Sequence, residues 1–148
     1  MADISAFPTI TKVIKYGSTG NVQTYTAGEA ITAGQVVGIA ATGVSNTVVV
    51  MDATSGENGV GVALYGAASG SPVAVAKDGC VVQVANADDT TAIDAGSTVV
   101  QDNNSVGGTV SAYGGTGAAS FVGVAEEDIA GGSTGYITVK CLEVSTDT

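Results

Sequence analysis

The stretch VGVALYGAASGS, residues 60–71, occurs a second time as VGVAEEDIAGGS, residues 122–133. Each copy opens with a short valine-rich run around a glycine and ends in a glycine-containing turn. The spacing of Gly59, Gly61 and Gly66 departs from the GxGxxG pattern of dinucleotide-binding loops, and no helix-forming segment follows. We therefore interpret the stretch as a strand and a turn used twice, with the glycines serving backbone geometry.

The similarity extends beyond this stretch at one interval, the 62 positions from residue 60 to residue 122. At that interval Ala33-Gly34 corresponds to Ala95-Gly96. About 17 of about 53 positions are identical without a gap, against about six or seven expected from such a biased composition. The sequence therefore predicts an internal duplication.

From Val22 onward the chain consists of short runs rich in Val, Thr and Tyr, separated by turn residues. Segments 72–79 and 136–144 alternate apolar and polar side chains, as strands with one buried face do. The best helix candidate, residues 56–70, has four glycines before Ala67, each costing about 1 kcal/mol in a helix interior. The sequence predicts an all-β fold, a compact β-barrel or β-sandwich with little or no helix.

The N-terminal residues 1–20 differ from the rest because they contain two of the four lysines and one of the two prolines. We interpret them as an extended N-terminal arm. Residues 21–148 are expected to form a single β domain of two related halves, at about residues 28–84 and 90–146. A half of roughly 57 residues has a marginal core alone, so the halves are expected to pack together.

The acidic composition of the chain argues against some classes of binding partner. Its net charge is −10, with four lysines and no histidine. Nucleic acid and anionic membrane surfaces are poor partners for such a chain because both bind through basic patches. The N-terminus lacks a charged region followed by a long apolar run, so we expect no signal peptide, no membrane span and synthesis in a cytoplasm.

The residues offer little for catalysis or metal binding. Without histidine a Ser or Cys nucleophile lacks its usual base, and no GxSxG motif is present. Cys80 and Cys141 have no CxxC spacing; they are interpreted as small apolar residues on strands, with a disulfide left open. Asp88-Asp89 and Glu126-Glu127-Asp128 could hold Ca²⁺, but no D-x-D-x-DG loop occurs, so they are interpreted as solvated turns. We expect no enzyme activity, no cofactor and no metal.

The arm carries the apolar residues of most interest, because apolar side chains in a mobile tail need a partner or a groove. On this interpretation, deleting residues 1–18 leaves a cooperative fold and removes binding. The alternative is that the arm forms the first strand of the domain itself. The candidate partner contacts are Phe7, Pro8, Ile10, Val13, Ile14 and Tyr16.

The two copies of the repeat differ most at one place, where Leu64-Tyr65-Gly66 becomes Glu126-Glu127-Asp128. An apolar and an acidic patch at equivalent positions let one protomer present different faces to two neighbours. The candidate protomer contacts are Leu64, Tyr65, Glu126, Glu127 and Asp128.

The order of these motifs resembles the head-decoration, or capsid cement, proteins of tailed phages. An AG turn and strand is followed by a GVA strand, an A-x-G-x-x-V-x-V turn and strand, and a G-x-V strand. The similarity covers about residues 26–146. A second clear copy of the rhythm and a longer arm distinguish this chain. The motifs lie at Ala33-Gly34, Gly61-Val62-Ala63, residues 68–75 and residues 79–82.

The resemblance implies a β-rich protein on the outside of an expanded icosahedral capsid, bound to the major capsid protein and often a homotrimer. It implies a location on the virion exterior and no catalytic residues. Two other functions stay open, another β-structural virion component such as a tail tube or fibre base, and a β-barrel that binds a small ligand or carbohydrate. The five scattered tyrosines make the second weak, because such sites use aromatic platforms.

Overall fold

The fold is all-β, as the sequence predicts: the described part of the chain contains eleven strands and no helix. This computed structural model describes residues 4–15, 20–40, 45–51, 59–88, 90–102, 106–114, 117–140 and 144–147, the backbone alone for 117–120 and 144–147. The strands are β1 (Val22–Ala27), β2 (Val36–Ile39), β3 (Thr47–Val50), β4 (Gly59–Ala63), β5 (Pro72–Ala76), β6 (Val81–Ala85), β7 (Thr98–Gln101), β8 (Val110–Ala112), β9 (Gly117–Ala125), β10 (Thr134–Val139) and β11 (Val144–Asp147).

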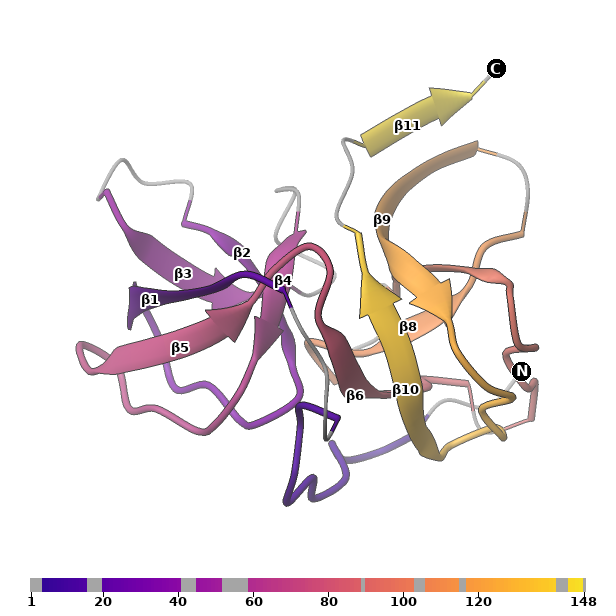
Figure 1. The fold of residues 1–148 in the computed structure, drawn as a ribbon, viewed down its shortest axis with the longest axis horizontal. Coiled ribbons are helices and arrows are strands. Elements are labelled where there is room, and N and C mark those ends of the chain that lie inside the picture. The colour runs from indigo at the N-terminus through magenta and orange to yellow at the C-terminus, as the bar shows by residue number, and fades with distance from the viewer. Residues whose placement is uncertain are drawn as a thin grey trace.

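The first five strands close into a barrel in the order β1-β3-β2-β4-β5, with β5 returning to β1 (Figure 1). The antiparallel ladder between β1 and β5 ends with Thr26 opposite Pro72. β1 runs parallel to β3, where Ala27 lies opposite Val48. We call β1–β5 the first barrel.

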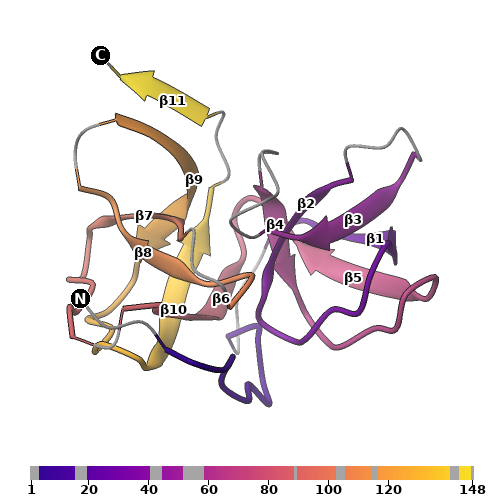
Figure 2. The ribbon, with the colours of Figure 1, turned by 180° about the vertical axis from the view of Figure 1, so that it is seen from behind.

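The next five strands form a second unit beside the first barrel (Figure 2). Its sheet has the order β6-β10-β9-β7-β8, and a parallel bridge between Asn86 and Val110 joins the end of β6 to β8. β11 pairs with the first half of β9, outside this path. The second unit, β6–β10, therefore repeats the strand arrangement of the first barrel.

The duplication is visible in the strand register. The ladder between β2 and β4 has an irregularity between Val37 and Gly38, of the kind a β-bulge produces. The ladder between β7 and β9 has the same irregularity between Val99 and Val100, 62 positions later. Two separately formed sheets share this defect at the interval found in the sequence, so the repeat is structural as well as compositional.

One strand follows a different interval. β6 occupies the place of β1, with Ala85 at the position of Thr26, because their partners Thr134 and Pro72 correspond. The interval from residue 26 to residue 85 is 59, so an ungapped comparison at 62 misses it. Strand pairing groups residues 22–76 and 81–139, whereas the sequence analysis places the halves at about 28–84 and 90–146.

The core explains why several strands read as unbroken apolar runs. In β2, Val37 points into the first barrel, while its neighbour Val36 belongs to a second apolar cluster shared with β6–β10. Both side chains have no exposed surface. Val62 on β4 and Ala76 on β5 also belong to the shared cluster. These three strands are therefore buried on both faces, and the two units share one core.

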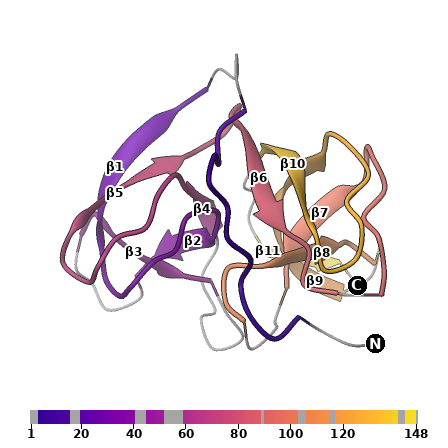
Figure 3. The ribbon, with the colours of Figure 1, turned by 90° about the horizontal axis from the view of Figure 1, so that it is seen from below.

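The N-terminal residues 4–15 run between the first barrel and the second unit, as the indigo segment in Figure 3 shows. Ile14 forms an antiparallel bridge with Val82 of β6. The N–H of Lys15 donates to the carbonyl of Val81, and the N–H of Gln83 donates to that of Val13. The segment is extended, as predicted, and is fixed to its own chain at the first strand of the second unit.

Candidate functional site

The structure places the arm residues in two groups. Ile10 and Val13 are 7% and 3% exposed and belong to the core shared by the two units. Phe7 and Ile14 are half-buried and pack against that core, and Pro8 is also half-buried. Tyr16 lies outside the described residues.

This placement changes what the arm can contact. Ile10 and Val13 pack in the groove between the two units, so their apolar side chains are buried against their own chain and are not available to a partner. Phe7 and Pro8 keep accessible surface next to that groove. Residues 10–15 therefore pack onto the domain, but in the described part of the chain they pair through a single bridge at Ile14 and not as its first strand, which is β1. Phe7 and Pro8 stay candidates for a partner contact.

The differing triplets lie on different units and are not brought together as one patch. Leu64 is half-buried against the shared core, and Tyr65 is 47% exposed on the first barrel. On the second unit Glu126 accepts the hydroxyl of Thr138. The two equivalent positions differ in burial as well as in chemistry, since Leu64 packs inward and Glu126 is exposed.

The other two acids of the second triplet accept backbone N–H groups from neighbouring segments. Glu127 accepts the N–H of Tyr136 at 3.0 Å, and Asp128 accepts the N–H of Ala95 at 2.8 Å. Both side chains are exposed. Backbone N–H groups near a turn need acceptors, and these carboxylates supply them at two neighbouring positions.

A polar centre that the sequence analysis missed lies just after β6. Asn86 and Asp88 are 1% and 5% exposed, so the interpretation of Asp88 as solvated is wrong. The Asn86 amide donates to the carbonyl of Thr91 at 2.8 Å, and Asp88 Oδ1 accepts the N–H and hydroxyl of Thr90, each at 2.9 Å. These bonds satisfy the buried groups and fix the segment that connects β6 to β7.

This polar centre predicts acid sensitivity. The N–H of Thr90 is the largest cause that lowers the pKa of the Asp88 carboxyl, ahead of the opposing effect of burial. The Asp88 carboxylate contributes its full stabilisation of the folded state above the pKa that an Asp side chain has in the unfolded chain, about 3.9. This contribution is lost as the pH falls through the lower pKa that the side chain has in the folded protein. We expect urea-unfolding curves to show a smaller loss of stability below about pH 4 for Asp88→Asn than for the natural chain, because the other carboxylates still titrate in the variant; equal acid sensitivity of the two would contradict this.

Cys80 is a buried thiol at the junction of the two units. Its Sγ–H donates to the carbonyl of Asn21 at 3.1 Å. Burial raises the pKa of the Cys80 thiol, against a smaller opposing effect of a backbone hydrogen bond involving Lys77, so the thiol stays protonated at neutral pH. Cys141 lies outside the described residues.

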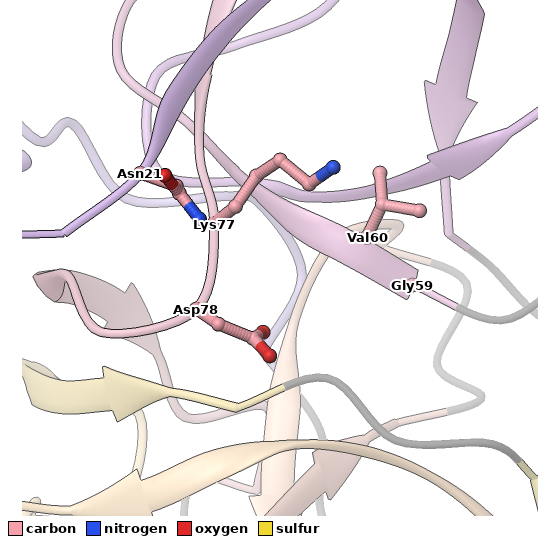
Figure 4. Close-up of a pocket in the computed structure, with 5 residues that line it drawn as sticks. All are labelled: Asn21, Gly59, Val60, Lys77 and Asp78. Carbon is pink, nitrogen blue, oxygen red and sulfur yellow. The ribbon is translucent and has the colours of Figure 1, made fainter.

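A surface hollow of about 320 Å³ opens at the end of the first barrel where β1 and β4 begin and β5 ends (Figure 4). Lys77 lies on its rim, with Nζ 3.3 Å from the side-chain oxygen of Gln23 and 5.6 Å from the ring centre of Tyr25. The hollow therefore combines a cation and a carboxylate, Lys77 and Asp78, with an amide and two small or apolar residues. Its lining residues are Asn21, Gly59, Val60, Lys77 and Asp78.

Comparison with known proteins leaves the family open. No family model matches the chain, and no curated protein is significantly similar to it. Within the described ranges, no cluster of three or more His, Cys, Asp or Glu side chains is placed to hold a metal ion. The same ranges contain no helix with the length and apolarity needed to cross a membrane.

Proposed function

We propose that this protein is a capsid decoration protein, which binds the outside of an expanded icosahedral capsid and stabilises it. The supporting observation is the order of turn and strand motifs that resembles that of tailed-phage decoration proteins, because the residues of these motifs have defined structural roles here. Gly34 and Gly96, the glycines of the two AG turns, have φ of +88° and +83°. Such angles favour glycine, so the rhythm reflects backbone geometry rather than glycine-rich composition.

The physical properties of the chain suit this role. A decoration protein must stay soluble until it meets a capsid, and a net charge of −10 favours solubility. Two β units with a shared core form a rigid body that can bridge neighbouring shell subunits. Modest contacts to several subunits then add through avidity.

Stabilisation follows from selective binding. A protein that binds the expanded shell but not its precursor lowers the free energy of the expanded state alone. Phe7 and Pro8, half-buried beside the groove, are the arm residues proposed to contact the major capsid protein.

Mixing purified protein with expanded, undecorated heads and with precursor heads tests the proposal. We expect the protein to cosediment with expanded heads alone and to raise the temperature at which they release their contents. A Phe7→Ala, Pro8→Ala variant is the matched probe of the arm contact, since it leaves Ile10 and Val13 in place. Expanded heads that neither gain mass nor resist heat better would refute the proposal.

A further inference from the structure

The contact between the first barrel and the second unit joins two unlike surfaces. One is the outer face of β2, β4 and β5, which we call the wall; its residues Val36, Val62 and Ala76 have no exposed surface. The other is the end of the second unit where β6 begins and β10 ends, which we call the end. Its buried residues Cys80, Val122 and Val139 belong to the same apolar cluster as the wall.

Backbone hydrogen bonds fix this wall-to-end contact. The N–H of Val36 donates to the carbonyl of Gly108 at 3.0 Å, and the N–H of Gly108 donates to the carbonyl of Met51 at 2.6 Å. The side-chain amide of Gln35 donates to the carbonyl of Gly107 at 2.9 Å. A Cβ on Gly108 would collide with Gln35. The two units are therefore joined in one defined orientation.

Because the units are repeats, each of them has a wall and an end. The wall of the second unit is accessible in the single chain: Thr98 is exposed and Val124 is 38% exposed. The end of the first barrel is the hollow, where Asn21, Val60 and Lys77 occupy the places of Cys80, Val122 and Val139. Equivalent backbone hydrogen bonds confirm this correspondence. In the first barrel the N–H of Lys77 donates to the carbonyl of Asn21, and in the second unit the N–H of Val139 donates to the carbonyl of Cys80.

The two accessible surfaces are more polar than the surfaces of the internal contact, although Val124 and Val60 keep the valine found at Val62 and Val122. On the wall, Val36 and Ala76 correspond to Thr98 and Thr138. More informative is the charge, because Leu64, packed against the internal contact, corresponds to Glu126.

The end carries a cation, Lys77, beside the carboxylate of Asp78. Buried Val139 corresponds there to Lys77, whose ammonium lies on the rim of the hollow. An acidic position on one surface thus matches a basic position on the other. The chain has only four lysines, so a lysine at this place is not a general property of its surface.

We propose that copies of this protein associate head to tail, with the end of the first barrel of one copy on the wall of the second unit of the next, and Lys77 facing Glu126. The internal version of the contact is apolar and permanent. The version between copies is polar, so it is reversible and compatible with a soluble free chain. Such unlike, heterologous contacts form closed rings when the rotation between neighbours closes. The proposal does not depend on capsid binding.

Sedimentation velocity of the purified full-length chain over a range of concentrations tests this. We expect reversible association of the natural chain, weakened by salt, and a dissociation constant raised about tenfold or more by Lys77→Glu or Glu126→Lys. The double variant with both changes restores the opposite pair and is expected to recover association. Lys12→Glu, the same charge change on the exposed part of residues 4–15, is expected to leave association unchanged.

Three results would each overturn the proposal: a natural chain that stays monomeric at the highest concentration, single variants that associate like the natural chain, or a double variant no better than the singles. Melting temperatures close to that of the natural chain are expected for every variant, because Lys77 is half-buried and Glu126 is exposed on the surface. A failure of capsid binding with intact self-association would count against the proposed function alone.

Discussion

Alanine at Gly61 or at Gly123 is expected to destabilise the protein by about 3 kcal/mol, the upper end of the usual cost of overpacking. A Cβ on Gly61 would collide with the carbonyl oxygen of Ala76, and one on Gly123 with that of Thr138. Both obstacles are backbone atoms of the neighbouring strand, so a side-chain rotation cannot relieve the collision. These glycines stand at the centre of the two VGVA strands.

Gly114→Ala is the matched control, because a Cβ there has no atom within 4 Å. It is expected to change the free energy of unfolding by less than about 0.5 kcal/mol. Urea unfolding followed by circular dichroism measures all three variants. If Gly61→Ala and Gly123→Ala were as stable as the control, the close approach of strands in both units would be wrong.

Ile10→Ala is expected to lower the free energy of unfolding by about 3 kcal/mol, within the range measured for buried Ile-to-Ala changes. Ile10 is 7% exposed and lies so close to Gly34 of the first barrel that a Cβ at that glycine would collide with its Cδ1. The cost arises because the groove between two rigid units cannot collapse around the missing atoms. Thermal or urea unfolding measures it directly.

Thr11→Ala, one residue further and exposed, is the control and is expected to be nearly neutral. The burial of Ile10 and Val13 also revises the expectation for deletion of residues 1–18: we expect a lower melting temperature in addition to any loss of binding. An Ile10→Ala variant as stable as Thr11→Ala would show that the segment binds its own chain only weakly.

Much of the fold follows from local signals in the sequence. The strand runs and the lack of helix follow from Val and Thr content and from the glycines that interrupt every helix candidate. The duplication is detectable because turns demand particular residues: Gly70 and Gly132, with φ of +85° and +68°, recur at the same interval of 62. Turn chemistry is local, so a single sequence reports it.

The remaining features depend on contacts between distant segments. β6 corresponds to β1 only through its partner strand, since the shorter interval of 59 removes the match from an ungapped comparison. The burial of Ile10 needs a groove made by two units, and an isolated pattern of apolar residues also fits a free arm. Asp88 reads as a surface residue because its carboxylate bonds only to its sequence neighbours Thr90 and Thr91. Its burial depends on a distant segment, since the N–H of Gly132 donates to its backbone carbonyl at 2.8 Å.

The candidate site shows the same division. The contrast between Leu64 and Glu126 is readable from the aligned copies, but its meaning depends on which surface of each unit is covered. Sequence alone does not show that the wall of the first barrel covers the end of the second unit. Once that contact is known, Lys77 becomes the residue to pair with Glu126, although its own neighbourhood in the sequence gives no such signal.

The most direct test of the proposed function is an electron cryomicroscopy reconstruction of expanded heads mixed with an excess of the purified protein. We expect added density on the outer surface at symmetric positions, of a size and shape that fit the first barrel and the second unit side by side. Bare heads at saturating protein, or density only inside the shell or on a tail, would contradict it.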